Sequence, residues 1–498
     1  MNVNPITRLD YPDPDVIRVE DTYYMVSTTM HFMPGCEILQ SFDLVHWEHV
    51  TYVYETLDHT DAQQLKSGQN IYGQGMWAAS LRYHEGRFYI CFVANDTRKT
   101  YLYTSEKIDG PWKKQLIEGF YHDGSLLFDE DGRSYIVYGN DEIWITELNE
   151  DLTAPKKDGL HRLLVSDHKN PELGYEGSHI QKINGYYYIF LIHSLRDRWM
   201  RTEACFYSDS LEGEFTGGDV LCDDRGYCGQ GVAQGGIVDT PDGKWYAMLF
   251  QDSGAVGRIP ILLPVTWKDH FPVFGQNGHV PEEIEVHSTR PGYIYQPLVG
   301  SDDFCNGLLP RWQFNHDPDP RYYHLDALQG TYTITTREVC TELTQAVNTL
   351  TQRMSYPSCA AEVTVDASAL KEGDVAGLCA LQGCYAAVGI TKHHGKYEVL
   401  MLDKKEDGIL DMTEGTVVES HQMDFRLEAD FCNMKDEARC YYRVNKGDWL
   451  PIGTVHKLYF KLDHFTGCRF GLFCYAAEET GGSACFRDFK YYDVDEIS

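Results

Sequence analysis

Five residues in the first half of the chain have side chains that could react with a ligand or bind it. Each lies at a nearly fixed distance before the last aromatic residue of a short sequence phrase that occurs five times. In four copies of the phrase, counting 12 residues back from the last aromatic residue reaches Trp77, Asp123, Glu176 and Gln234. In the first copy the distance is 11 residues, and the residue is Asp13. Equivalent positions in repeated units occupy equivalent places around a common axis. We therefore expect three carboxyl groups, an indole and an amide to converge on one site.

Two or three carboxyl groups in a pocket beside a tryptophan indicate cleavage of a glycosidic bond. Such a reaction needs one protonated acid for the leaving oxygen and a second carboxylate that activates water or attacks the sugar. A third carboxylate helps by raising the pKa of the acid through like-charge repulsion. The indole of Trp77 would offer an apolar face to a sugar ring.

Each of these residues also has a structural explanation when taken alone. Asp13 precedes a proline and could form a turn, Asp123 could cap a hairpin, and Glu176 could be a solvated strand residue. Trp77 could belong to a hydrophobic core, and Gln234 could bond to backbone groups. The shared distance favours the convergent site, because coincidence would have to explain every copy.

The repeated phrase is itself a hairpin signature. An apolar strand end is followed by a tight turn, often Asp-Gly, Asn-Gly or Glu-Gly, and then by paired aromatic residues. The hairpins recur at intervals of roughly 45 to 65 residues, which predicts five similar β units and a five-bladed β-propeller. The copies are IRVEDTYY (17–24), LRYHEGRFY (81–89), LFDEDGRSY (127–135), IQKINGYYY (180–188) and IVDTPDGKWY (237–246).

The second half of the chain has a different pattern. A stretch with frequent proline and glycine, roughly 270–300, is typical of a linker. From Ser301 onward, short segments such as AAEVTVDAS, AAVGITK and RFGLFCY predict antiparallel strands with one buried face, and hence a β-sandwich. We predict an all-β protein with a propeller over 1–295 and a sandwich over 296–498.

The composition restricts the partners and the compartment. The net charge of −32 argues against nucleic acid or an anionic membrane as a partner. The chain opens without the basic and apolar regions of a signal peptide, and no stretch is apolar enough to span a membrane. The 15 cysteines show neither a CxxC pair nor a zinc spacing. We expect reduced thiols and a cytoplasmic protein.

In its motifs, the first half resembles glycoside hydrolase family 43. The resemblance starts at NPITRLDYPDPDVIRVEDTYYMVSTT and continues through GMWAASLRYHEGRFYICF, HDGSLLFDEDGRSYIVYG and YEGSHIQKINGYYYIF. It ends with QGGIVDTPDGKWYAMLFQDSGAVGRIPILLPVTW, so it covers nearly all of 1–270 in order. The second half resembles the concanavalin-like jelly roll attached to β-xylosidase members of that family. The resemblance implies a five-bladed propeller that hydrolyses with inversion.

The resemblance also implies roles for individual residues. Asp13 in PDPD matches the general base, and Glu176 in YEGSH matches the general acid. Asp123 in HDGS matches the aspartate that tunes the pKa of that acid and orients it. The remaining matches imply sugar-binding roles. Trp77 and Phe32 match aromatic walls of the sugar site, and Arg258 matches an arginine that reaches the bound sugar.

The chain departs from the family pattern near the acid and on the axis. HDGS and EGSH replace commoner motifs, so the loop around the acid is expected to differ. Gln234 stands where many members carry a histidine that ligates an axial calcium or orders water. An amide makes a tight axial calcium less favourable, although its oxygen can still ligate. We expect no required cofactor, with calcium only as a structural ion, for example near Asp303 and Asp488.

Together these expectations describe an exo-acting, inverting glycoside hydrolase that releases xylose, arabinose or both from plant-wall oligosaccharides. It would be a β-xylosidase or α-L-arabinofuranosidase, with the sandwich as a lid that narrows the pocket. One alternative is an endo-arabinanase, which needs an open groove. Another is a non-catalytic carbohydrate-binding propeller, whose carboxylates only bond sugar hydroxyls. The sequence does not distinguish xylose from arabinose, and it is compatible with a homo-oligomer.

Overall fold

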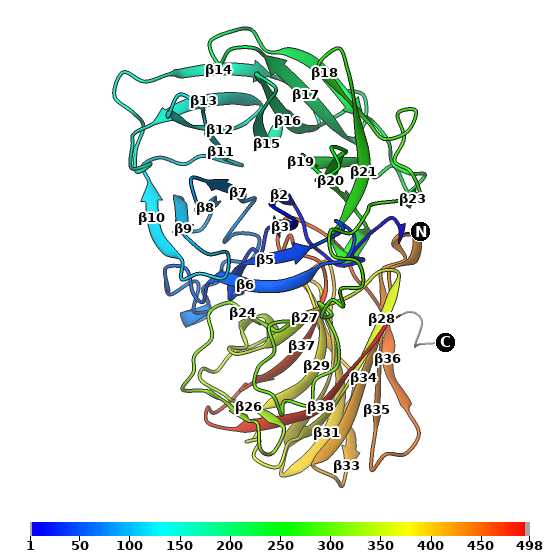
Figure 1. Ribbon diagram of the computed structural model, residues 1–498. Coiled ribbons are helices and arrows are strands. Elements are labelled where there is room, and N and C mark those ends of the chain that lie inside the picture. Colours follow the sequence, from blue (N-terminus) through cyan, green and yellow to red (C-terminus); the bar gives the residue numbers. More distant parts are fainter. Residues whose placement is uncertain (1, 494–498) are drawn as a thin grey trace.

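The computed structural model describes residues 2–493 and consists of β structure almost throughout (Figure 1). Within these residues the helical segments are 3₁₀ turns at Lys66–Gly68, Gly254–Val256, Leu343–Gln345 and Cys432–Met434. None of the helical segments described is long and apolar enough to cross a membrane. The prediction of an all-β protein is confirmed.

Five four-stranded antiparallel sheets follow one another in the first half of the chain and form the blades of a propeller (Figure 1). Blades one and two contain β2 (Asp15–Val19), β3 (Thr22–Val26), β5 (Gly35–Ser41) and β6 (Glu48–Tyr54), then β7 (Ser80–His84), β8 (Arg87–Ala94), β9 (Lys99–Ser105) and β10 (Lys113–Ile117). Blade three contains β11 (Ser125–Phe128), β12 (Ser134–Asn140), β13 (Glu142–Leu148) and β14 (His161–Ser166). Blades four and five contain β15 (Glu176–Ile183), β16 (Tyr186–Ser194), β17 (Arg201–Ser208) and β18 (Thr216–Leu221), then β19 (Val232–Asp239), β20 (Trp245–Asp252), β21 (Arg258–Lys268) and β22 (Phe271–Phe274).

The first strand of each blade lies next to the axis of the propeller. β2 contacts β7, and contacts continue from β7 to β11, β15 and β19 and from β19 back to β2, which closes the ring. A short pairing of β1 (Asn2–Val3) with β23 (Glu283–Ile284) joins the chain start to the segment after the fifth blade. The five predicted hairpins form the two inner strands of each blade, which confirms the five-bladed propeller.

The turns of these hairpins follow from their sequence. Asn184 and Gly185, between β15 and β16, have φ angles of 50° and 85°. Glu85 and Gly86, between β7 and β8, have φ angles of 47° and 79°. Positive φ at both central residues gives a turn whose twist matches that of the paired strands.

The second half of the chain forms two large antiparallel sheets. One contains, in spatial order, β32 (Leu410–Met412), β31 (Lys396–Lys404), β30 (Ala386–His393), β29 (Val375–Leu381), β37 (Arg469–Tyr475), β27 (Leu350–Arg353), β24 (Gln313–Asn315) and β4 (Phe32–Met33), with β33 (Thr416–Val418) paired to β31. The other contains β25 (Tyr323–Asp326), β26 (Thr331–Thr335), β38 (Ser483–Asp493), β28 (Ser358–Asp366), β34 (Gln422–Asp430), β35 (Glu437–Arg443) and β36 (Leu450–Lys457).

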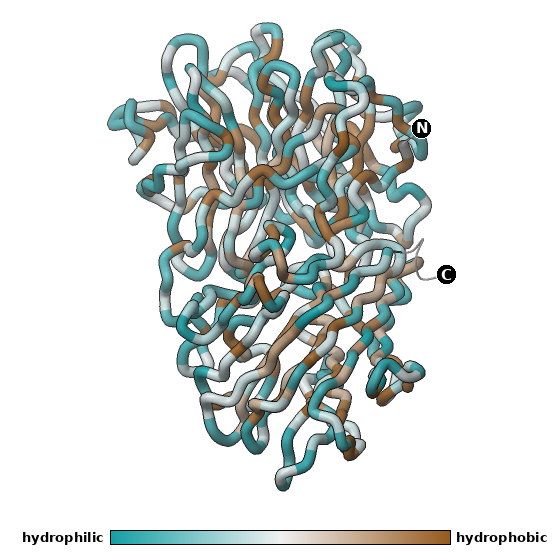
Figure 2. The backbone as a smooth tube through the Cα atoms, turned by 60° about the horizontal axis from the view of Figure 1, so that its bottom comes forward, coloured by the Kyte–Doolittle hydropathy of each residue, from teal (hydrophilic) through white to brown (hydrophobic). Residues whose placement is uncertain are grey.

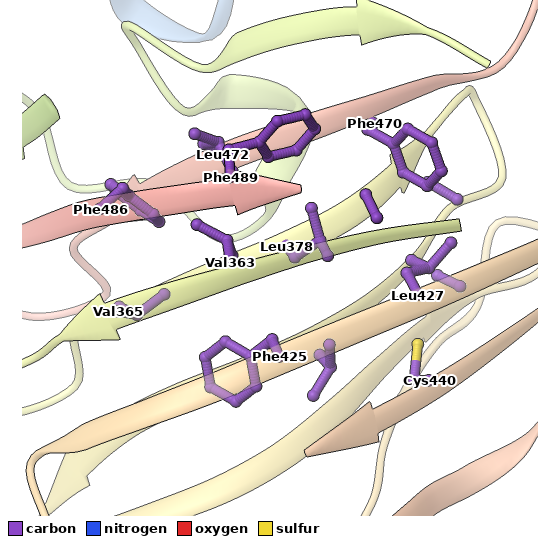
Figure 3. Packing of buried hydrophobic residues seen from close by; sticks show 14 of the residues in the cluster. Val363, Val365, Leu378, Phe425, Leu427, Cys440, Phe470, Leu472, Phe486 and Phe489 are labelled. Atoms are coloured by element: carbon purple, nitrogen blue, oxygen red, sulfur yellow. The ribbon is translucent and has the colours of Figure 1, made fainter. Parts of the chain in front are cut away.

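Alternate residues of these strands fill the core between the two sheets. Along β34, Met423, Phe425, Leu427 and Ala429 are buried while the residues between them are partly exposed. Figure 3 shows Phe425 and Leu427 packed in the same cluster as Leu378, which lies on the opposite sheet. This alternation with a period of two is the sandwich pattern read from the sequence. In Figure 2, hydrophobic residues recur along the strands, whereas the outer loops are mostly hydrophilic.

One strand links the two halves of the molecule. β4 lies between β3 and β5 in the chain, but it pairs with β24 in the sandwich sheet. Nearby, the buried Arg353 of the sandwich forms an ion pair with the buried Glu37 of the propeller at 2.9 Å. Because removal of one partner from a buried pair is costly, this contact fixes how the two halves are placed.

Candidate active site

The backbone turns sharply at the inner ends of the blades, where the predicted site residues lie. Asp13, Asp123 and Gln234 have φ angles of 52°, 47° and 62°, which non-glycine residues rarely adopt. Gly177, which follows Glu176, has a φ angle of 65°. In β15 and β19 the pairing register shifts at these points. Such bulges re-aim side chains, here toward a common space above the axis.

That space is a cavity of about 660 Å³, and six of the seven predicted site residues line it. They are Asp13, Trp77, Asp123, Glu176, Gln234 and Arg258. The residues selected by their distance from the repeated phrase therefore meet in one place.

Phe32 is the exception, and its prediction as a wall of the sugar site is corrected. It is 0% exposed and belongs to strand β4 at the junction with the sandwich. The guanidinium carbon of Arg469 lies 3.5 Å from the centre of its ring. Since its ring is enclosed by this interface and does not line the cavity, Phe32 has no face for a sugar.

The carboxylate of Asp13 is held on both oxygens. Its Oδ2 accepts a hydrogen bond from the hydroxyl of Thr28, and its Oδ1 accepts one from Nη1 of Arg258 at 2.8 Å. Among the described residues, no acceptor reaches the buried Nε and Nη2 of Arg258. Buried donors of this kind are normally bonded, so these groups are suited to bind the hydroxyls of a ligand.

The carboxyl group of Glu176 lies at the cavity surface, with its side chain 19% exposed. Its Oε2 accepts a hydrogen bond from Nδ2 of Asn140 at 2.6 Å. Nε2 of His122 lies 3.5 Å from the same oxygen and 3.5 Å from Oδ2 of Asp123. His122 thus stands between two carboxyl groups.

Asp123 is more deeply buried than Glu176. Its Oδ2 accepts a hydrogen bond from the backbone N–H of Gly177 at 2.9 Å. Burial raises the pKa of Asp123 to about 6, with the charges of Glu176 and Asp13 adding to the rise and His122 opposing it. For His122, burial lowers the pKa, but Asp123, Glu176 and Asp13 outweigh it and raise the pKa to about 9. His122 is therefore a cation at neutral pH.

The sandwich supplies the other wall of the cavity. Phe465 lies with its ring centre 5.5 Å from that of Trp77 and 4.3 Å from the guanidinium carbon of Arg258. The aromatic wall is therefore made by Trp77 and Phe465, one from each half of the molecule. The sandwich residues that line the cavity are Met434, Phe460, Lys461, Leu462 and Phe465.

The segment around Phe465 is anchored to the propeller by buried hydrogen bonds. Asp10 accepts from the backbone N–H of Arg258 through Oδ1 and from that of Gly467 through Oδ2, both at 2.8 Å. Nε2 of Gln382 donates to the carbonyl of Ala255 at 3.0 Å and to that of Thr466 in this segment at 3.3 Å. These bonds hold the segment 461–467, which we call the lid segment, against the mouth of the propeller.

The cavity extends beyond the carboxyl groups toward solvent. Trp199, which is 43% exposed, stands at its outer part beside Arg201. Arg201 in turn lies 2.7 Å from Asp252 through its Nε. An exposed indole beside a fixed charge pair is suited to bind a further sugar unit.

Gln234 is positioned by its backbone. Its N–H donates to Oε2 of the fully buried Glu203 at 2.7 Å. Burial raises the pKa of Glu203 well above its usual value. The bond secures the left-handed backbone of Gln234 at the bulge of β19.

One group of three side chains within residues 2–493 could hold a metal ion. It consists of His122, Asp123 and Glu176, whose ligand atoms lie within 4.8 Å of one another. Calcium takes about six to eight oxygen ligands, so a set with one imidazole nitrogen suits it poorly. Asp303 and Asp488 belong to no such group among the described residues, and the calcium position near them stays a prediction.

Sequence reasoning missed two kinds of residue in this site. His122 and Asn140 do not lie at the fixed distance from the repeated phrase. The packing of blade three against blade four places them beside Glu176. Phe465 lies 388 residues after Trp77 in a segment without a motif. A contact of that sequence separation gives no local signal. The HDGS departure was the one available sign that the surroundings of the acid would be unusual.

Comparisons with known proteins agree with this geometry. The family model described as glycosyl hydrolases family 43 matches residues 3–272, and that of the beta xylosidase C-terminal concanavalin A-like domain matches residues 301–492. A beta-xylosidase of Formosa agariphila is 27% identical over 99% of this chain and 89% of its own length. A structure described as a bifunctional GH43-CE of Bacteroides eggerthii is 42% identical with a TM-score of 0.92, covering 99% of this chain, which spans 64% of that one.

A further solved structure covers both chains almost completely. It is 28% identical over 99% of each chain, with a TM-score of 0.86, and is described as an engineered GH43 glycoside hydrolase with both endo-xylanase and exo-arabinofuranosidase activity. Three findings lead to one assignment. They are the propeller with three converging carboxyl groups, the concanavalin-like sandwich and the family match over more than half of the sequence. The chain belongs to glycosyl hydrolases family 43.

Proposed function

We propose that this glycoside hydrolase is an exo-acting, inverting β-xylosidase or α-L-arabinofuranosidase that acts on plant-wall oligosaccharides. The observation that carries the proposal is the grouping of Asp13, Asp123 and Glu176 in one cavity whose far wall is the sandwich. The activities by which two relatives are described, beta-xylosidase and exo-arabinofuranosidase, support the substrate class.

In the proposed reaction, Asp13 and Glu176 act on opposite sides of the sugar. Asp13 takes a proton from the water that attacks the anomeric carbon, while Glu176 gives its proton to the glycosidic oxygen as that bond breaks. Arg258 and Thr28 orient the base. Asp123 stands behind the acid at the backbone of Gly177. No covalent intermediate is needed, and the product carries the inverted configuration.

The position of the lid segment favours exo action over endo action. An endo-arabinanase must leave a groove open on both sides of the cleaved bond. Here Phe460, Lys461 and Phe465 of the sandwich line one side of the cavity. A chain end can enter such a site, whereas the middle of a polymer would meet the sandwich.

The first test concerns the acid. In Glu176→Gln the proton donor is lost, so turnover of a pentose disaccharide should fall roughly 10²–10⁴-fold. A nitrophenyl pentoside should lose much less, because its leaving group needs little protonation. Steady-state kinetics on both substrates measure the difference. Equal losses would contradict the role of Glu176, and no turnover of any pentoside by the wild type would favour the carbohydrate-binding alternative.

The same assay separates the two sugars. Product release from defined xylo- and arabino-oligosaccharides will show which pentose leaves the chain end. Release of single pentoses supports exo action, whereas release of internal oligosaccharides would support the endo-arabinanase.

We further propose that the reaction needs no cofactor, because the three carboxyl groups supply both the acid and the base. Dialysis against EDTA should leave kcat and KM on nitrophenyl pentosides unchanged. A loss that calcium restores would contradict this proposal and point to a structural or catalytic ion.

The cysteines support action in a reducing compartment, and we propose the cytoplasm. All 15 cysteines are free thiols, and nine of them, including Cys36, Cys379 and Cys468, are buried. Buried thiols of this number are typical of proteins kept reduced. Fractionation of the native source with an activity assay tests the proposal.

A further inference from the structure

The acid proposed above is held through one of its two oxygens. The two donors near Glu176 both approach Oε2, Asn140 at 2.6 Å and His122 at 3.5 Å. Both belong to blade three, Asn140 at the end of β12 and His122 in the turn before β11, whereas Glu176 begins β15 of blade four. The two blades therefore meet on a single oxygen of the acid.

The chemistry of a carboxylic acid makes this asymmetry meaningful. Its carbonyl oxygen accepts hydrogen bonds, and its hydroxyl oxygen donates one. An amide NH₂ and a charged imidazole can only donate, so they stabilise the form in which the oxygen facing them carries no proton. Two donors on Oε2 place the proton of the acid on Oε1.

We propose that Asn140 and His122 are positioning residues that keep the proton of Glu176 on Oε1, where it can reach the glycosidic oxygen. This inference rests on the proposed function, since it assumes that Glu176 is the acid. Neither residue carries a motif role or a repeat position.

The same contacts strengthen during the reaction. As the proton leaves Oε1, negative charge develops on the carboxyl group, and hydrogen bonds to a charged acceptor are roughly twice as strong as neutral ones. Interactions that grow in the transition state raise kcat, whereas those equal in both states change only KM. The contribution of Asn140 and His122 should therefore appear in kcat.

The experiment uses the full chain and the variants Asn140→Leu, Asn140→Asp and His122→Leu. Asn140→Asp keeps the shape of the side chain but replaces the donor by an acceptor. His161→Leu serves as the matched control, because His161 is an exposed histidine of the same blade. Among the described residues its side chain bonds only to Thr146, and its ring stacks on Trp144. Thermal unfolding of each variant confirms that it folds.

We expect kcat on a pentose disaccharide to fall about 10- to 100-fold in the Asn140 and His122 variants. On a nitrophenyl pentoside the fall should be less than about threefold, and KM should change little on either substrate. His161→Leu should match the wild type on both. In a Glu176→Gln background, Asn140→Leu should cause no further loss, because its effect acts through the missing proton.

Three outcomes would overturn the inference. Equal losses on both substrates would indicate a structural role, and a rise in KM alone would indicate a contact with the sugar. A full additional loss in the Glu176→Gln background would show action independent of the acid. If Glu176→Gln itself fails to separate the substrates, the proposed acid is wrong as well. If it separates them and the Asn140 and His122 variants do not, only this inference fails.

Discussion

The surroundings of the two reacting carboxyl groups differ in a way that matches their proposed tasks. Asp13 is 5% exposed and receives a donor on each oxygen, one of them the guanidinium of Arg258. Glu176 is more exposed, and within residues 2–493 its donors approach one oxygen only. A base needs a fixed direction toward one water, whereas an acid needs one oxygen free to give up its proton.

Stereochemistry gives a direct test at this scale. A water must fit between the base and the sugar, so the carboxyl groups of Asp13 and Glu176 should lie about 6.5–9.5 Å apart, compared with about 5 Å in retaining enzymes. NMR of the first-formed sugar should show the inverted anomer. Asp13→Asn should lose activity on disaccharide and nitrophenyl pentoside alike, because water activation is needed for both. Retention of configuration would contradict the mechanism.

At the scale of elements, the inner strands and the lid segment build the site from opposite sides. Bulges at the starts of β15 and β19 turn Glu176 and Gln234 inward. The lid segment is held by Asp10, which bonds to the backbone of Arg258 and of Gly467. A single aspartate thus couples the position of the sugar-binding arginine to that of the aromatic wall.

The contribution of the lid segment can be measured with Phe465→Ala. The ring of Phe465 packs against both Arg258 and Trp77, and loss of a desolvated cation–π contact should raise KM on nitrophenyl pentosides about tenfold. Leu328→Ala, at a sandwich residue that is 96% exposed, is the control and should leave KM unchanged. An unchanged KM in Phe465→Ala would mean that the sandwich does not wall the sugar site.

What the sequence could predict depends on how local each feature is. The hairpins and the residues at a fixed distance from them repeat along the chain, so Asp13, Asp123 and Glu176 were identifiable before the structure. Asn140 and Phe465 reach the site through contacts between blades or between domains, which leave no periodic trace. Phe32 is the opposite case. Its motif match predicted a wall of the sugar site, but the pairing of β4 with β24, which the motif does not reveal, buries it.

At the scale of the whole molecule, three buried histidines lie at the junction of propeller and sandwich. The ring of His31 lies 4.8 Å from that of His316 and 5.0 Å from that of His464. Burial lowers the pKa of all three, for His464 to about 3. His464 directly precedes Phe465, so this cluster supports the aromatic wall from behind.

The histidine cluster predicts a loss of stability in weak acid. Above a pH of about 6.5 the rings are neutral in both folded and unfolded chains, so they add no pH dependence. Below it these three rings take up protons only in the unfolded chain, and each ring lowers the free energy of unfolding by about 1.4 kcal/mol per pH unit, down to its pKa in the folded state. Carboxylates with lowered pKa values, such as Asp15 and Glu37, lose their contribution only below about pH 4.5. Carboxyl groups whose pKa burial raises to about 6, such as Asp123 and Asp317, take up protons in the folded chain and oppose the decline.

His31→Phe removes one of these titrating groups and should make the decline shallower. Urea unfolding between pH 7 and pH 4.5 should show the free energy of unfolding falling less steeply than in the wild type, by about 1.4 kcal/mol per pH unit. His161→Phe changes an exposed ring, so its decline should run parallel to that of the wild type. A parallel decline in His31→Phe would show that the junction takes up protons without unfolding.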